Sequence, residues 1–320
     1  MNRPNGLLFI GIGIIVILLS TIFFLSSRKP AGSASECVQK AETLLAKEQY
    51  DQAIGECCTA ISLDPQFLKA YKTRAQVYTM KGDIDGAISD YNKIIELDPE
   101  NSNNFLELAS LCTSRGNNSN AISALEKAIK IDAKNPFVFW KVGDTYLNLG
   151  RCQDSVVAYN QAVRLAPTLA GPYVSRANVY SSLGAYDKAL SDYNKSIELD
   201  PKNEEAYVAR AGFYVSRKNY DLAMSNYNKA IQLKPQYYQA HLGRGTLLGT
   251  LGEPEKAIAD FTKAIKVGPK QADAYIARAE IYASENMKRK ATNDYLKAIS
   301  ATTDATSVHN LKQKINEVNK

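Results

Sequence analysis

The 320-residue sequence predicts an all-α fold, an α-α superhelix of about eight stacked helix-turn-helix repeats, on three observations. Two helix-period apolar patterns separated by a short break fill each interval of 34 residues. Small residues recur at fixed places in that interval. A period of this length is typical of solenoids, whose units bury their apolar faces only against one another. The third observation is a proline that marks the interval: Pro65, Pro99, Pro167, Pro201, Pro235 and Pro269.

Each predicted repeat consists of a first helix, a turn and a second helix. In the second repeat, apolar spacing predicts helices that include 70–80 and 87–97, with Gly82 between them. Glycine ends a helix readily because it tolerates positive φ, and proline cannot continue one. The repeats are expected at 34–67, 68–101, 102–135, 136–169, 170–203, 204–237, 238–271 and 272–305.

The pattern of large and small residues resembles the tetratricopeptide repeat family. Aromatic residues recur at the fourth, eleventh and twenty-fourth places, and small residues at the eighth and twentieth. The second repeat shows the full motif: Tyr71, Ala75, Tyr78, Ala87, Tyr91 and Pro99. The resemblance extends from residue 34 to about residue 305 and implies a tetratricopeptide solenoid. Departures such as Cys57 and His241 weaken local packing but not the assignment.

The resemblance also implies where a protein or peptide partner binds. In this family the first helices line a concave groove, and here the central groove is expected to be an apolar stripe bordered by small polar residues, which suits a peptide segment. The groove residues that it predicts are Lys72, Gln76, Phe137, Trp140, Lys141, Asp144, Val174, Asn178, Val208, Leu242, Thr246 and Ile276.

Trp140, the single tryptophan, has two interpretations. It is either a binding hot spot, since buried aromatic anchors dominate interface energies, or a packing residue against the neighbouring repeat. A further family feature, the clamp for chaperone tails, is incomplete. Lys72 and Gln76 begin it, but Glu107 stands where the clamp needs asparagine and would repel a carboxylate. We therefore expect no binding of chaperone tails.

Charged residues at the seventh and twenty-third places change together. Where the first is arginine, the second is usually aspartate, whereas Leu108 goes with Ala124 and Val142 with Ala158. A partly buried charge requires a partner, so we interpret these as structural ion pairs; an arginine ladder for anions is the alternative. Lys40 and Glu56 occupy the same places in the first repeat. The predicted pairs are Arg74–Asp90, Arg176–Asp192, Arg244–Asp260 and Arg278–Asp294.

Residues 7–25 are uncharged and apolar, which predicts a transmembrane helix. A helix of 19 residues spans about 28 Å, close to the thickness of the hydrocarbon core. Residues 1–6 form a short tail and 26–33 a linker, giving a single-pass membrane protein whose repeats lie on an undecided side. A cleaved signal ending near Ser35 is the alternative. Residues 306–320 are expected to form a capping helix through the apolar stripe Val308, Leu311, Ile315 and Val318.

The sequence offers no catalytic or metal site. The two histidines and five cysteines show no spacing typical of metal ligands, and the repeats leave no room for a catalytic domain. Five is an odd number of cysteines, and Cys37 and Cys57 either stay reduced in the core or form a disulfide after export. The net charge of +6 is dispersed and lacks aromatic stacking platforms, so no nucleic acid, small-molecule substrate or cofactor is expected. We expect a membrane-anchored adaptor; the alternative is an exported soluble factor that assists envelope or secretion assembly.

Overall fold

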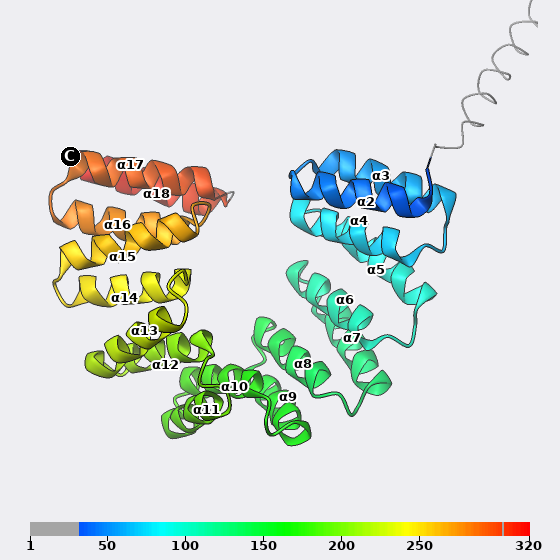
Figure 1. The fold of residues 1–320 in the computed structure, drawn as a ribbon, viewed down its shortest axis with the longest axis horizontal. Coiled ribbons are helices and arrows are strands. Elements are labelled where there is room, and N and C mark those ends of the chain that lie inside the picture. The colour runs from blue at the N-terminus through cyan, green and yellow to red at the C-terminus, as the bar shows by residue number, and fades with distance from the viewer. Residues whose placement is uncertain (1–31, 303) are drawn as a thin grey trace, which may run out of the picture. The chain divides into compact units, whose positions relative to one another are not determined.

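The computed structural model describes residues 32–302 and 304–320, and these residues fold as α-helices and short connections only. The predicted membrane anchor, residues 7–25, lies outside the described residues. Seventeen helices are present in the described part of the chain, arranged as about eight pairs and a last single helix (Figure 1). The all-α prediction is therefore confirmed.

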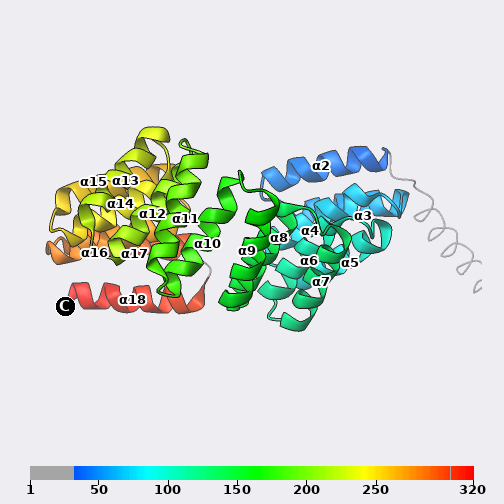
Figure 2. The same cartoon turned by 90° about the horizontal axis from the view of Figure 1, so that it is seen from below.

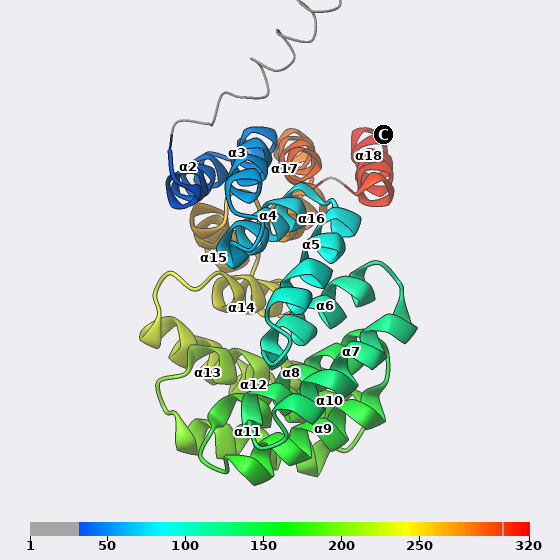
Figure 3. The ribbon, with the colours of Figure 1, turned by 90° about the vertical axis from the view of Figure 1, so that its right-hand side faces the viewer.

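The chain divides into two compact units, residues 1–149 and 150–320. The division falls between two helices of the predicted fourth repeat. The described helices of the first unit follow one another from blue to green in Figures 1 and 3. They are α2 Ala34–Ala46, α3 Tyr50–Leu63, α4 Leu68–Lys81, α5 Ile84–Leu97, α6 Ser102–Ser114, α7 Asn118–Ile131 and α8 Pro136–Asn148.

The second unit packs its helices in the same sequential manner. Each helix from α10 to α17 contacts the helix before and after it, and α10, α12, α14 and α16 also contact one another in succession. The helices are α9 Cys152–Leu165, α10 Ala170–Ser182, α11 Tyr186–Leu199, α12 Glu204–Ser216, α13 Tyr220–Leu233, α14 Tyr238–Thr250, α15 Pro254–Val267, α16 Ala272–Ser284, α17 Lys288–Ala301 and α18 Ala305–Asn319.

The turns between paired helices place one residue in the left-handed region. Glycine occupies this position in five turns, for example Gly82 with φ 86°. Glu48, Lys218 and Asn286 adopt φ of 60°, 57° and 58° at the equivalent place. These three non-glycine residues carry strain that the surrounding helix packing must offset, since a left-handed backbone costs an ordinary side chain about 1–2 kcal/mol.

The core consists of small residues where helices approach and of aromatic rings between them. Ala211 and Ala223 are fully buried on facing helices of one pair, beside the ring of Tyr227. Gly245 permits one of the close approaches: a Cβ atom there would lie 2.7 Å from the buried ring of Phe261. The recurring small residues of the sequence are thus the contact points between helices.

The last helix covers the end of the second unit. Figure 2 shows α18 lying along α16 and α17. Leu311 of α18 is buried among residues of these two helices, with Ile315 and Val318 packed beside it. Lys314 forms an ion pair with Glu280 of α16, which fixes the helix further. This arrangement shields apolar surface that would otherwise be exposed at the end of the array.

Candidate functional site

The first unit contains a pocket of about 550 Å³ between α4 and α6, which we call the α4–α6 pocket. In this unit α2 packs on α4 and α6 packs on α8, whereas α4 and α6 are farther apart. Two of the predicted groove residues, Lys72 and Gln76, line the opening. The pocket is lined by Lys69, Lys72, Thr73, Gln76, Thr79, Met80, Ile84, Tyr91, Glu107, Ser110, Leu111 and Ser114.

The floor of the α4–α6 pocket is buried and mostly apolar, and its rim is polar. Thr73 and Leu111 are buried at the floor, beside the half-buried ring of Tyr91. Met80 is 54% exposed, so a large apolar side chain borders the opening. The hydroxyl of Ser110 is also exposed at the rim. Such a mixture can bury an apolar side chain of a ligand and form hydrogen bonds with its backbone.

Two opposite charges flank the pocket without an ion-pair partner in the described residues. Lys72 lies on α4 and Glu107 on α6, and neither forms a salt bridge there. Lys69, by contrast, pairs with Glu42 at 2.9 Å. Burial, together with the negative charge of Glu107, raises the pKa of Tyr91 to about 12. The charge of Glu107 is therefore felt at the floor, and Lys72 and Glu107 can each bind a ligand group of opposite sign.

The predicted aromatic hot spot lies on α8, at the end of the first unit. Phe137 is 54% exposed, and its ring centroid lies 6.3 Å from that of the half-buried Trp140. Lys141 is exposed on the same helix, and its Nζ lies 3.9 Å from a carboxylate oxygen of Asp144. Phe137 thus offers more free ring surface than Trp140 does.

The apolar groove residues predicted for the second unit are largely used in packing. Val174 is only 7% exposed and lies in a core cluster with Phe213. Val208, Leu242 and Ile276 are half-buried and pack against other core clusters, which leaves part of each for a partner.

The polar groove residues of the second unit are exposed. Asn178 accepts a hydrogen bond of 2.6 Å from the Tyr193 hydroxyl, and Thr246 donates to the backbone carbonyl of Leu242. The first helices of this unit therefore present exposed polar groups beside half-buried apolar ones.

The structure brings together the charged residues at the seventh and twenty-third places. Each of the four predicted arginines donates from Nε and Nη2 to both carboxylate oxygens of its aspartate, at 2.6–2.9 Å. The aspartates are at most 9% exposed and the arginines 15–21%. Such bidentate, partly buried pairs are structural, because they occupy the groups that an anion would need. The pairs are Arg74–Asp90, Arg176–Asp192, Arg244–Asp260 and Arg278–Asp294.

These arginines also bond to the preceding repeat, which sequence reasoning missed. In each case Nη1 donates to a side chain 16 residues earlier, at the twenty-fifth place of the repeat before, over 2.6–3.1 Å. Arg210 does the same, and its second-helix partner is Asn226. We call these contacts the arginine bridges. They are Arg74 to Cys58, Arg176 to Asn160, Arg210 to Asn194, Arg244 to Asn228 and Arg278 to Thr262.

His241 replaces the tyrosine that other repeats carry at the fourth place. The hydroxyls of Tyr71 and Tyr173 donate to the carbonyl of the proline six residues earlier, and His241 Nε2 lies 2.9 Å from the Pro235 carbonyl. Its Nδ1 lies 3.2 Å from Asp260. Burial opposes the charge of Asp260, but hydrogen bonds from Arg244 and His241 lower its pKa to about 2.

Within residues 32–302 and 304–320, no three His, Cys, Asp or Glu side chains are grouped as metal ligands would be. None of the described helices has the length and apolar composition that a membrane span requires. All five cysteines, Cys37 and Cys57 included, are free thiols in the structure.

Sequence profiles of known families match most of the repeat region. Profiles described as "Tetratricopeptide repeat" match residues 68–101, 138–169, 172–203 and 242–304. One described as "TPR repeat" matches residues 109–150 and 213–252. A search of curated proteins gave no match.

Several solved structures are similar in fold. The crystal structure of yeast Tom70 aligns with a TM-score of 0.73 and 19% identity, over 91% of this chain and 65% of that chain. A tetratricopeptide repeat protein from Parabacteroides merdae ATCC 43184 aligns at 0.59 and 21%, over 79% and 99%. The APC/C hetero-tetramer Cut9–Hcn1 aligns at 0.56 and 16%, over 90% and 57%. The chain thus spans less than two thirds of the first and third proteins' lengths.

Proposed function

The chain belongs to the tetratricopeptide repeat family, and from this premise we propose that it is a membrane-tethered adaptor that holds a protein partner in the α4–α6 pocket. Tetratricopeptide domains bind proteins or peptides, and their repeats act as scaffolds rather than enzymes. The proposal adds the binding site and the tether. Residues 7–25 supply the tether through their uncharged, apolar sequence.

The observation that carries the proposed site is the open pocket of about 550 Å³ with two unused charges at its rim. A peptide segment with an acidic side chain near Lys72 and a basic one near Glu107 satisfies both. The exposed Gln76 and Ser110 lie about one turn farther along α4 and α6 than Lys72 and Glu107, and they can bond to the peptide backbone. Met80 then covers an apolar side chain of the same segment.

Photocrosslinking in cells tests the site. A photoreactive residue replaces Gln76 at the rim of the pocket in the full-length chain, and a control places it at Lys93, on the second helix of the same repeat outside the pocket. We expect partner adducts from position 76 and not from position 93. Adding Lys72→Ala or Glu107→Ala should reduce the adduct about tenfold, because each removes a charge-assisted contact. Equal capture from both positions, or no effect of these substitutions, contradicts the proposed site.

The tether has a separate test. Intact mass of the cellular protein should include residues 1–35, and the protein should remain with membranes after alkaline extraction. A mass that lacks these residues favours the alternative, an exported soluble factor that assists envelope or secretion assembly. The crosslinking result does not depend on this outcome, so the binding site and the membrane anchor are tested independently.

A further inference from the structure

The outer face of the α2–α3 hairpin is the end of the first unit that no other described hairpin covers. In the next repeat, α4 packs against both α2 and α3 on their other side. In the second unit, by contrast, α18 covers the last hairpin through Leu311. Among the described residues, the α2–α3 face therefore has no neighbouring hairpin packed on it.

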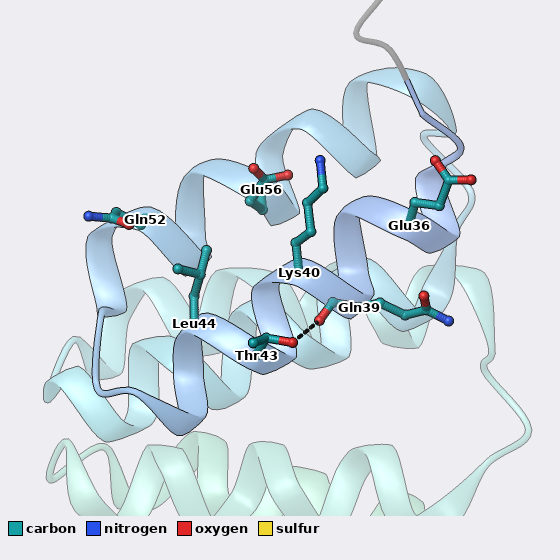
Figure 4. Close-up of a pocket in the computed structure, with 7 residues that line it drawn as sticks. All are labelled: Glu36, Gln39, Lys40, Thr43, Leu44, Gln52 and Glu56. Carbon is teal, nitrogen blue, oxygen red and sulfur yellow. Dashed lines mark hydrogen bonds between the residues drawn. The ribbon is translucent and has the colours of Figure 1, made fainter.

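This face is hollowed into a pocket of about 610 Å³. Figure 4 shows Lys40 and Leu44 rising from α2 toward the side on which α3 carries Gln52 and Glu56. Leu44 is the only apolar residue of the lining, and the rest is polar or charged. The full lining is Glu36, Gln39, Lys40, Thr43, Leu44, Gln52 and Glu56.

The two charges in the middle of this pocket lack the pairing that their places carry elsewhere. Lys40 and Glu56 stand at the seventh and twenty-third places, where Arg74 and Asp90 form a bidentate pair. Among the described residues neither Lys40 nor Glu56 forms a salt bridge. Glu36, at the edge, is already used, because it accepts a hydrogen bond from the Ser33 backbone in a capping box.

We propose that a second copy of this chain docks on the α2–α3 face, with Lys40 of each copy paired to Glu56 of the other. A two-fold contact presents the same patch on both subunits, so one cation and one anion per copy form two identical ion pairs. The contact sets the same hairpin face of each copy against the other. It also places the Leu44 side chain of each copy against the other copy. Any other partner would need both charges at a matching separation.

The size of the face predicts a weak dimer. The 13 residues of α2 form a helix about 20 Å long, and two helices side by side, each about 10 Å across, give a face of roughly 400 Å² per copy. A total of about 800 Å² lies below the roughly 1,200–2,000 Å² of stable specific interfaces, in the range of weak ones. Association should therefore be reversible and should weaken with salt, because two ion pairs contribute much of its specificity.

Charge exchange tests the dimer in the full-length chain in detergent, with two differently tagged forms measured by sedimentation and by co-purification. We expect the unaltered chain to self-associate, and Lys40→Glu alone or Glu56→Lys alone to weaken this at least about tenfold, because each places like charges opposite one another. Mixing the two variants should restore association to within about threefold. The carboxylate introduced at position 40 of one variant then faces the ammonium introduced at position 56 of the other, but only if the contact is the two-fold one described.

The controls address folding and the apolar amino-terminal segment. Lys134→Glu makes the same charge change at an exposed site outside the pocket and should leave association unchanged. All variants retain residues 1–31, so association through that segment would be insensitive to the exchange. A monomer at about 200 µM, association indifferent to both substitutions, or a mixture that stays dissociated each overturns the proposal. So does a photoreactive residue at position 44 that captures only other proteins.

Discussion

Asp192→Ala should destabilise the second unit by removing the acceptor of a partly buried guanidinium. Asp192 Oδ1 and Oδ2 each accept a hydrogen bond of 2.7 Å from Arg176. The side chains are 9% and 15% exposed, so water replaces the carboxylate poorly. Burial disfavours the charge of Arg176, yet the hydrogen bonds to Asp192 raise its pKa, which shows that the carboxylate more than offsets desolvation. Of the hydrogen bonds of this guanidinium, the one from Nη1 to Asn160, 2.7 Å long, remains in the variant.

The expected cost is about 2–3 kcal/mol. Removing one partner of a fully buried ion pair costs about 3–5 kcal/mol, and the residual exposure and the Asn160 contact reduce this. Arg176→Leu alone should cost a similar amount, because it leaves the carboxylate unpaired. The double variant reproduces the Leu108 and Ala124 combination of the third repeat. It should cost no more than about 2 kcal/mol, giving a coupling energy of at least about 2 kcal/mol.

Denaturant unfolding measures the change in global stability, and hydrogen exchange in α10 and α11 measures the local change. Both are needed because a repeat array need not unfold in two states. Lys195→Ala is the matched control on α11: its pair with Glu198 is exposed to solvent and should contribute little to the free energy of unfolding. A coupling energy under about 0.5 kcal/mol, or equal effects of Asp192→Ala and Lys195→Ala, would refute the assignment of Arg176–Asp192 as a structural pair.

Three further predictions concern packing, the cap and pH. Gly245→Ala should lower the free energy of unfolding by about 1–3 kcal/mol, because the new methyl group collides with Phe261. Gly212→Ala has open space around it and should raise the free energy of unfolding by about 0.5–1 kcal/mol; thermal unfolding measures both. Leu311→Ala should cost about 2–4 kcal/mol and increase hydrogen exchange in α17 and α18. Since the folded pKa of Asp260 is about 2, below its usual 3.8, its contribution is present above pH 4 and is lost as pH falls toward 2; Asp260→Asn should flatten stability over that range.

Each of these has a clear contrary result. A gain in stability for both glycine variants would show that the Phe261 ring moves aside without cost. Unchanged exchange in α17 after Leu311→Ala would show that α18 does not protect the last hairpin. An acid transition that Asp260→Asn leaves unaltered would place the responsible carboxylates elsewhere.

The sequence predicted the helices and their turns because both follow local rules. Apolar spacing indicated the paired helices, and the register of the prolines indicated breaks even where Glu48, Lys218 or Asn286 replaces glycine. The 34-residue period also predicted that Arg176 lies opposite Asp192, because the residues at the seventh and twenty-third places change together from repeat to repeat.

The packing between repeats was less predictable. The bond from Arg176 to Asn160 depends on how neighbouring hairpins are rotated, and the wider separation of α4 and α6 follows from no single residue. In the sequence, Glu107 differs from the asparagine that a chaperone-tail clamp needs, but nothing there marks it as a residue of the α4–α6 pocket. Val174 has the apolar character of a groove residue, but its side chain is buried in the core. The residue type alone does not distinguish a groove position from a core position.

The arginine bridges give successive repeats of the second unit the same hydrogen bond at their junctions. Each guanidinium needs only an acceptor at one fixed place in whichever hairpin comes before it, and Asn160, Asn194 and Asn228 are chemically identical acceptors. Excising residues 204–237 would set Arg244 against Asn194 in place of Asn228, with no donor orphaned. A chain of this kind can lose or duplicate residues 170–203, 204–237 or 238–271 and still present an acceptor to the arginine at each new junction, because Asn194, Asn228 and Thr262 occupy the same place.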